Sequence, residues 1–237
     1  MAAPPSSLLD REVYDERLAA DVLGVAQPTL HYWLEGGNQR GKAHEPVLRA
    51  APTGSKVVTW GEFVEARYLR EYRRTLGASL SNIRAFIQHL RRELDVSYPL
   101  ARARPWVGPG RHLFIVAQNE AGLPSDLWAA IEPVIEPHTG VAMLLPPAEA
   151  FLERVEFDDD QTGIVVRLRP DGQESPVVID PDVRFGSPAV HGIPTDAIDE
   201  QVRAGDSIES IVQDFSLELD DVIAALRYES LRRQPVG

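Results

Sequence analysis

The sequence contains no cysteine, which excludes disulfide bonds and thiolate metal sites and fits a reducing, intracellular location. Long apolar runs are missing too, because no stretch approaches the roughly 20 residues that a membrane-spanning helix needs. The first residues, MAAPPSSLLDRE, lack the basic and then apolar order of a secretory signal peptide. We therefore expect a cytoplasmic protein with no membrane partner.

Sequence motifs of common enzymes are absent as well. The chain has no HExxH zinc motif, no Walker-type glycine loop, no GxSxG motif and no dinucleotide fingerprint. Its six histidines show no ligand spacing. We expect neither enzyme activity nor a cofactor. The alternative is a metal-dependent enzyme that uses Asp158, Asp159 and Asp160, although aspartates at a hairpin tip are more typical of a solvated turn.

Basic residues are scarce in the second half of the chain. Residues 1–112 hold 16 Lys and Arg against 12 Asp and Glu, a net charge of +4. Residues 113–237 hold 8 against 24, a net charge of −16, so the whole chain carries −12. This asymmetry indicates a basic part for nucleic acid and an acidic part for another partner, unless the acidic residues only keep the surface soluble.

The stretch RLAADVLGVAQPTLHYWLEGG, residues 17–37, has the spacing of two short helices joined by a turn. Gly24 supplies a residue free to take a positive φ, and Ala20, four residues earlier, lets two helices cross closely. The predicted apolar stripe of the first helix consists of Leu18, Ala19, Val22 and Leu23.

The second helix is predicted to begin at Gln27, with a proline in its first turn. Its buried face is predicted to consist of Leu30, Trp33 and Leu34, at i, i+3, i+4 spacing. The order alanine, glycine, leucine, tryptophan is typical of a DNA-binding helix-turn-helix. An ordinary αα-hairpin in a helical core has the same spacing.

Glycines, prolines and basic residues follow in NQRGKAHEPVLRAAPTGSKVVTW, residues 38–60. This pattern predicts a β-hairpin wing beside the second helix, and a plain surface loop is the alternative. Cations of a wing contact phosphates and fix register rather than read bases. The candidates are Arg40, Lys42, Arg49 and Lys56.

Two longer helices are expected next. Thr59 and Glu62 form a predicted capping box at the start of the first, and Ser79 caps the second. In the second helix the residues Leu80, Ile83, Ile87, Leu90 and Leu94 recur at the spacing of a lengthwise seam, for which we expect an intramolecular partner. The arginines of both helices are either solvated or, for some of them, placed to contact DNA; they are Arg67, Arg70, Arg73, Arg74, Arg84, Arg91 and Arg92.

A mixed segment occupies residues 111–180. We expect a strand in HLFIVAQ, a helix from Ser125 to about Glu136, and short strands in VAMLL, RVEF, GIVVRLRP and SPVVID. The turns between them are expected at 158–160 and 170–172.

The final part has a helical pattern again. We expect Thr195 to cap a helix that ends at Gly205, Asp206 and Glu209 to form a capping box, and Ser216 to cap a third helix. The predicted core of this trihelical unit consists of Ile198, Val202, Ile208, Ile211, Val212, Phe215, Leu219, Val222, Ile223 and Leu226. The third helix opens with the carboxylates Glu218, Asp220 and Asp221, which repel phosphates, so we expect this unit to bind protein rather than DNA.

Residues 179–231 resemble the small domain of unknown function numbered 433, which occurs in VapB-type antitoxins. The matching positions are Asp180, Pro181, Gly186, Pro188, Gly192, Ile193, Ala204, Gly205, Ser207, Ile211 and Phe215. Where the family pattern has Gly-Thr-Arg-Ile, this chain has Gly192, Ile193 and Pro194, so a role tied to that arginine does not carry over.

The N-terminal section resembles the MerR-like winged helix-turn-helix through LGVAQPTLHYW and LSNIRAFIQHLRREL. His31 stands where such proteins often carry arginine. Together the two resemblances imply an antitoxin that neutralises a PIN-domain ribonuclease toxin and represses its own operon by binding operator DNA.

These observations predict an α+β protein with three parts. They are a MerR-like winged helix-turn-helix in residues 1–110, a mixed middle segment in 111–180 and a trihelical antitoxin domain in 181–237. We expect a homodimer or a toxin–antitoxin hetero-oligomer, with paired recognition helices about 34 Å apart or a multiple of that distance.

The predicted DNA-reading residues are Gln27, Thr29, His31 and Tyr32, with Arg40, Lys42 and Lys56 on phosphates. The predicted toxin-binding residues are Arg227, Tyr228, Arg232 and Arg233, the last two in a mobile tail from which one arginine reaches the metal-binding carboxylates of the nuclease. The alternative is that these terminal arginines only complement the helix macrodipole.

A different function would place the main site in the middle segment. In that alternative the chain is a stand-alone MerR-like transcriptional regulator, and a small molecule binds in an apolar pocket lined by Trp106, Phe114 or Trp128.

Overall fold

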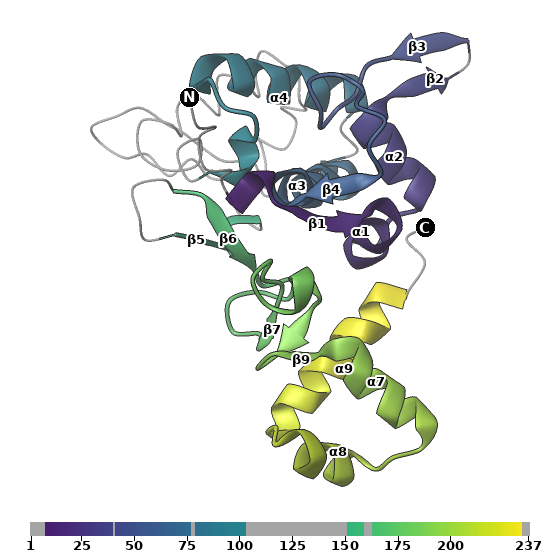
Figure 1. Cartoon of the computed structure of the whole chain (residues 1–237), viewed down its shortest axis with the longest axis vertical. Helices are drawn as coiled ribbons and strands as arrows, with labels where there is room; N and C mark the ends of the chain where they lie inside the picture. Colours follow the sequence, from purple (N-terminus) through teal and green to yellow (C-terminus); the bar gives the residue numbers. More distant parts are fainter. Residues whose placement is uncertain (1–7, 40, 77–78, 103–150, 159–162, 234–237) are drawn as a thin grey trace, which may run out of the picture.

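The computed structural model describes residues 8–39, 41–76, 79–102, 151–158 and 163–233, with only the backbone described at 39, 75 and 76. It is a mixture of helices and small sheets, which confirms the predicted α+β class. A larger N-terminal body lies above a smaller C-terminal unit, and strands β5 to β7 connect the two (Figure 1). Within the described ranges, no helix is long and apolar enough to cross a membrane.

The N-terminal body is built from short strands and four helices of the described chain. Its elements are η1 (Leu8–Asp10), β1 (Glu12–Asp15), α1 (Glu16–Leu23), α2 (Gln27–Glu35), β2 (Gly37–Gln39), β3 (Lys42–His44), β4 (Val57–Thr59), α3 (Trp60–Leu76), α4 (Leu80–Leu94) and η2 (Pro99–Ala101). Strand β1 pairs antiparallel with β4, and β2 pairs antiparallel with β3.

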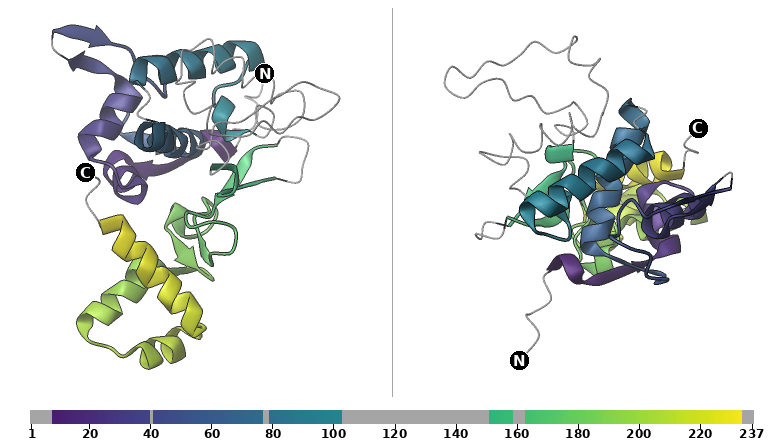
Figure 2. Two further views of the ribbon diagram at one scale, coloured as in Figure 1. Left: turned by 180° about the vertical axis from the view of Figure 1, so that it is seen from behind. Right: turned by 90° about the horizontal axis from the view of Figure 1, so that it is seen from above.

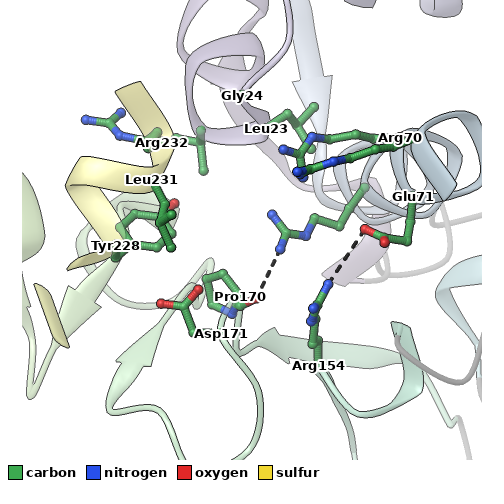
Figure 3. Close-up of a pocket in the computed structure, with 13 residues that line it drawn as sticks. Leu23, Gly24, Arg70, Glu71, Arg154, Pro170, Asp171, Tyr228, Leu231 and Arg232 are labelled. Atoms are coloured by element: carbon green, nitrogen blue, oxygen red, sulfur yellow. Dashed lines mark hydrogen bonds and ion pairs between the residues drawn. The ribbon is translucent and has the colours of Figure 1, made fainter. Parts of the chain in front are cut away.

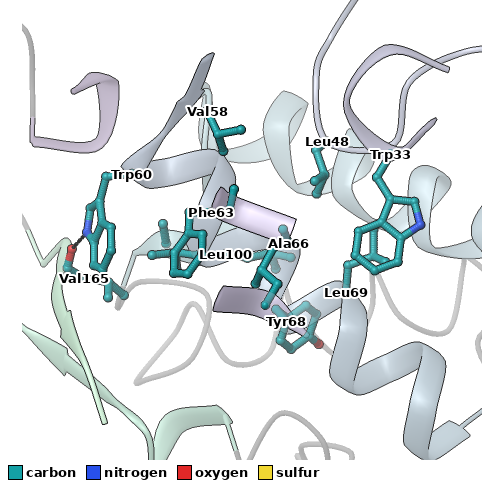
Figure 4. Packing of buried hydrophobic residues seen from close by; sticks show 14 of the residues in the cluster. Trp33, Leu48, Val58, Trp60, Phe63, Ala66, Tyr68, Leu69, Leu100 and Val165 are labelled. Carbon is teal, nitrogen blue, oxygen red and sulfur yellow. Dashed lines mark hydrogen bonds between the residues drawn. The ribbon is translucent and has the colours of Figure 1, made fainter. Parts of the chain in front are cut away.

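Helix α3 runs through the centre of this body and supplies its largest buried side chains. Trp60, Phe63, Tyr68 and Tyr72 are all fully buried, and the Trp60 and Phe63 rings stack with centroids 5.7 Å apart (Figure 4). The helix starts with the predicted capping box, since the Thr59 and Glu62 side chains each accept the other's backbone N–H.

Helix α4 packs along the same core, as its seam spacing predicts. Ile83, Ile87, Leu90 and Leu94 are buried, and the side chain of Ser79 caps the helix by accepting the N–H of Asn82 at 3.1 Å. The residues against which this seam packs belong to the core of the same chain, as expected.

The described part of the middle segment joins the N-terminal core. Strands β5 (Val155–Phe157) and β6 (Val165–Leu168) form an antiparallel hairpin, as expected from RVEF and GIVVRLRP. The Trp60 indole donates a hydrogen bond of 2.7 Å to the Val165 carbonyl, which is drawn in Figure 4. The expected elements between residues 103 and 150, and the turn residues 159 and 160, lie outside the described residues.

The C-terminal unit has a second core of its own. Its elements are β7 (Val177–Val178), η4 (Arg184–Gly186), β8 (Ala189–Val190), β9 (Ile193–Pro194), α7 (Thr195–Ala204), α8 (Ile208–Phe215) and α9 (Leu219–Arg233). The three strands form one antiparallel sheet. The buried side chains of this core are Val177, Val190, Ile198, Ile211, Leu217, Val222, Ala225 and Tyr228. The expected trihelical unit is therefore present.

Three predicted caps in this unit are wrong. Thr195 is the first residue of α7 and its hydroxyl lies near Pro188 O and Glu229 Oε1 instead of capping. Ser207, not Asp206, caps α8 by accepting the N–H of Ser210. Ser216 closes α8 in a left-handed conformation and does not start α9.

Three residues assigned to apolar cores are exposed instead. Leu18 of α1 is 41 % exposed, and Leu219 and Ile223 of α9 are 52 % and 49 % exposed. Helix α9 buries the face that carries Val222, Ala225 and Tyr228, and at the helical period Leu219 and Ile223 point away from this face.

The two parts are in contact at β1 and at α1. The buried Tyr14 hydroxyl donates a hydrogen bond of 2.6 Å to the Gly186 carbonyl, and Arg11 forms an ion pair with Asp182 beside it. At the other contact, the last turns of α9 lie beside α1, where Arg232 forms an ion pair with Asp21 (Figure 2).

Candidate functional site

The helix pair forms as its spacing predicts. Helix α1 ends at Gly24, whose φ of 65° is left-handed, and the Gly24 N–H caps the carbonyls of Ala20 and Asp21. Ala20 is buried at the crossing, and α2 begins at Gln27 with Pro28 in its first turn. The turn therefore sets the angle between α1 and α2.

Helix α2 buries one face and exposes the start of the other. Leu30, Trp33 and Leu34 are buried, whereas Gln27 and Thr29 are exposed. No side chain caps the N-terminus of this helix, and its first turn contains no acidic residue. The positive end of its dipole therefore faces solvent, where an anion is favoured.

His31 and Lys56 share a buried carboxylate that sequence reasoning missed. His31 Nδ1 lies 2.9 Å from Glu16 Oε1 and 3.1 Å from Lys56 Nζ, and Lys56 Nζ lies 3.4 Å from Glu16 Oε2. Nδ1 either donates to the carboxylate or accepts from the ammonium, so it satisfies only one of them at a time. The side chain of Lys56 is 66 % exposed, so it is the partner that is free to turn outward.

The predicted wing is present and is fixed to the end of α2. The β2–β3 hairpin projects from the body beyond α2 (Figure 1). A Cβ at Gly36 would overlap the His44 carbonyl, and the half-buried Tyr32 ring contacts the His44 ring edge-on with centroids 6.2 Å apart. Lys42 is exposed on the hairpin, and Arg40 lies outside the described residues.

Arg49 is not a phosphate-binding residue of the wing, contrary to expectation. It is buried and forms ion pairs with Glu35 and Glu62, with 2.7 Å between its Nε and Glu62 Oε1. It also donates to the carbonyls of Ser55 and Val57. A buried arginine with this many partners holds the loop between the wing and β4.

Two arginines of α4 are likewise bound within the protein. Arg84 donates to the carbonyls of Glu45 and Pro46, at 2.6 and 2.9 Å. Arg91 pairs with the buried Glu65 at 3.1 Å. These contacts remove both arginines from the set available to DNA, while Arg92 is exposed.

The predicted toxin-binding residues lie on α9 in different environments. Both terminal arginines belong to the last turn of this helix, so the predicted tail begins later than expected. Arg233 Nη2 lies 2.5 Å from Asp199 Oδ1, and Arg232 Nη2 lies 2.6 Å from the buried Glu229 Oε2. Tyr228 is buried, and Arg227 is exposed.

Residues that would serve the alternative functions are mostly outside the described chain. The described residues do not include Trp106, Phe114, Trp128, Asp159 or Asp160. Among the described residues, no group of three or more His, Asp or Glu side chains is arranged to hold a metal ion. Asp158 Oδ1 accepts the N–H of Ile164 at 2.8 Å, as expected of a hairpin turn.

A family model described as "Protein of unknown function (DUF433)" matches residues 177–228, which are most of the C-terminal unit. Two proteins of Mycobacterium tuberculosis H37Rv are similar over nearly the whole chain. "Uncharacterized protein Rv2308" is 33% identical over 227 residues, covering 94% of this chain and 92% of the relative. "Putative antitoxin VapB45" is 26% identical over 228 residues, covering 92% and 93%.

A crystal structure shares the fold. Rv2018 from Mycobacterium tuberculosis matches with a TM-score of 0.68 at 24% sequence identity, over 93% of this chain and 100% of that chain. The arrangement of an N-terminal body and a C-terminal unit therefore has a counterpart of the same extent in a solved structure.

Proposed function

The chain belongs to the family of the mycobacterial protein Rv2308, and from this premise we propose that it is an antitoxin of a type II toxin–antitoxin system. Its N-terminal body binds operator DNA and represses the operon. Its C-terminal unit binds and neutralises a PIN-domain ribonuclease toxin.

The observation that carries this proposal is the extent of the similarity to "Putative antitoxin VapB45", which spans 92% of this chain and includes both parts. The match to "Protein of unknown function (DUF433)" supports a shared role for the C-terminal unit. A protein that joins a helix-turn-helix to a second, separately cored unit suits two partners.

On the DNA side, the exposed N-terminal end of α2 enters the major groove. Gln27 and Thr29 contact base edges first, because they lie in the first turn, and the half-buried His31 and Tyr32 border them. Lys56 turns away from Glu16 to a phosphate, and Lys42 and Arg40 follow the backbone from the wing. A homodimer places two such helices one DNA turn apart.

On the toxin side, α9 offers an exposed apolar pair beside basic residues. Leu219 and Ile223 lie four residues apart on one face and are about half exposed, and Arg227 follows four residues later. A toxin helix or loop covers the apolar pair, and an arginine from the end of α9 contacts the acidic cluster of the nuclease. Arg233 reaches this acidic cluster only when its ion pair with Asp199 breaks.

Co-expression tests the toxin side. We would purify the tagged chain together with the product of the adjacent gene and measure RNA cleavage with and without this protein. A stable complex with silenced ribonuclease is expected. Arg227→Ala and Arg233→Ala should restore cleavage at least tenfold, whereas Arg203→Ala, an exposed arginine of α7 that also pairs with Asp199, should not. The absence of any complex would contradict the antitoxin role.

Gel-shift titration with DNA from upstream of the gene tests the DNA side. Gln27→Ala should weaken binding about 5- to 150-fold, since a good base contact contributes about 1–3 kcal/mol. Gln213→Ala, which removes an exposed glutamine on α8, is the matched control and should bind as tightly as the wild type. Equal DNA affinities of the two variants would show that α2 does not contact DNA.

A further inference from the structure

An open cavity lies where the N-terminal body, the middle hairpin and the C-terminal unit meet (Figure 3). Its volume is about 570 Å³, within the range of roughly 300–1,000 Å³ that small-molecule sites occupy. Its walls come from the end of α1, one face of α3, the residues flanking β5 and β6, and the last turns of α9. The lining residues are Val22, Leu23, Gly24, Arg67, Arg70, Glu71, Arg74, Arg154, Pro170, Asp171, Tyr228, Leu231 and Arg232.

The cavity is strongly basic in a chain whose formal net charge is −12. Five arginines line it against two carboxylates, Glu71 and Asp171, which leaves a formal charge of +3. Two of these arginines are paired: Arg154 lies 3.6 Å from Glu71, and Arg232 is held by Asp21 and Glu229.

The unpaired arginines of the lining are therefore Arg67, Arg70 and Arg74, which share one face of α3, and they stand against one further carboxylate, Asp171. Arg67 donates a 3.3 Å hydrogen bond to the Pro170 carbonyl. Arg70 and Arg74 make no hydrogen bond or ion pair within the part of the chain that the structure describes. Burial and the neighbouring Arg70 and Arg154 charges lower the pKa of Arg67 to about 10, despite the favourable charges of Tyr228 and Glu71. Three like charges on one wall repel one another, so an anion between them would be bound favourably.

Two polar groups of the lining also lack partners. The Tyr228 hydroxyl and the Arg70 Nε are buried and make no hydrogen bond to any described residue, and Tyr228 is only 5 % exposed. In Figure 3 the Tyr228 ring and the Arg70 guanidinium come from opposite walls of the cavity. Buried donors without acceptors are uncommon and call for a missing partner.

We infer that this cavity binds a small ligand with at least two phosphate groups, such as a nucleoside diphosphate or triphosphate. Guanidinium groups recognise phosphate oxygens through paired, charge-assisted hydrogen bonds. Two phosphate groups carry about three negative charges near pH 7, the sign that three unpaired arginines favour. Leu23, Leu231 and Pro170 provide an apolar wall for the organic part of the ligand.

The position of Arg70 connects the ligand to the helix pair. A Cβ at Gly24 would lie 3.5 Å from Arg70 Nη2, so this guanidinium lies against the turn between α1 and α2. A ligand held by Arg70, Arg67 and Tyr228 therefore bridges α3 and α9 and stabilises the folded junction by mass action. This inference does not depend on the proposed antitoxin role, because its test uses the chain alone.

Calorimetric titration and thermal melting of the full chain, with pyrophosphate and with ATP in the presence of EDTA, test the inference. Both probes should bind and raise the melting temperature, while sulfate at equal ionic strength should have a much smaller effect. The double variant Arg70→Gln, Arg74→Gln should raise the Kd about tenfold or more. Arg92→Gln, which removes an exposed arginine on α4, should leave the Kd unchanged.

Tyr228→Phe provides a second variant that preserves the fold. It removes only the unpartnered hydroxyl, so the ligand-free melting temperature should stay the same or rise, while the Kd for pyrophosphate should rise several-fold. Absence of binding to the wild type would overturn the inference. So would equal affinities of the Arg70/Arg74 and Arg92 variants, sulfate binding as tight as pyrophosphate binding, or displacement of pyrophosphate by a DNA duplex of random sequence.

Discussion

At the scale of single residues, one buried carboxyl of α3, that of Glu65, makes the stability of the N-terminal body depend on pH. Glu65 is fully buried, with its two oxygens 3.1 Å from the Leu100 N–H and from Arg91 Nη2. Burial raises the pKa of the Glu65 carboxyl to about 7, against the opposing effect of Arg91. In the unfolded chain the pKa of this carboxyl returns to an ordinary value near 4.3.

Glu65→Gln tests this assignment. Between about pH 4.5 and 7 the folded state holds a proton that the unfolded state releases, so in the wild type this group lowers the free energy of unfolding as pH rises. The variant should lose that slope, measured by urea denaturation at several pH values. Glu93→Gln, at an exposed position of α4, is the control and should follow the wild-type curve. A Glu65→Gln curve parallel to the wild type would show that Glu65 is already ionised in the fold.

Residue-level roles were the hardest to predict from the sequence. The spacing identified which face of α2 is buried, because period and burial are linked. It did not identify Glu16 beneath His31 and Lys56, or the partners of Arg49, because these pairs join positions 13 to 40 residues apart. A charged residue in a basic, turn-rich stretch suggests solvent exposure, and only the fold shows that Arg49 is buried.

At the scale of elements, most helices and short strands within the described residues follow from the sequence, but their ends shift by one or two residues. Several residues near each start are able to cap, and the backbone path decides among them. Asp206 and Ser207 are neighbours, yet only Ser207 has its side chain on the N–H of Ser210, at 3.2 Å.

Matched alanine variants distinguish the two caps. Ser207→Ala should lower the free energy of unfolding of the C-terminal unit by about 1 kcal/mol, the usual loss for a cap. Asp206→Ala should have a smaller effect, because it removes only a charge near the N-terminus of α8. Circular dichroism during urea denaturation measures both. A larger loss for Asp206→Ala would assign the cap to the predicted residue.

At the scale of the whole molecule, two cores are joined through a small set of polar contacts. The sequence separates the basic and acidic halves by charge, but it gives no sign that Tyr14 reaches Gly186 or that residues from 22 to 232 surround one cavity. Contacts across such sequence separations depend on how the parts dock, which local patterns do not encode.

Tyr14→Phe tests how strongly this docking couples the parts. The change leaves the buried Gly186 carbonyl without its donor, at a cost of about 1–3 kcal/mol. Amide hydrogen exchange around β8 should therefore become about 5- to 150-fold faster. Tyr98→Phe removes a tyrosine hydroxyl within the N-terminal body, where it accepts from Thr59, and should leave exchange around β8 unchanged. The same acceleration in both variants would exclude a specific coupling through Tyr14.

Gly186 has a consequence for building chimaeras. Its φ is +75°, and a Cβ there would overlap the Tyr14 hydroxyl and come within 2.8 Å of Val13 Cγ1, so any side chain at this position pushes the C-terminal unit away from β1. A unit grafted from a relative keeps the native docking only if it has glycine at this position and an acidic partner for Arg11. Interchangeability of the two parts within the family therefore depends on a few positions of the junction rather than on overall sequence identity.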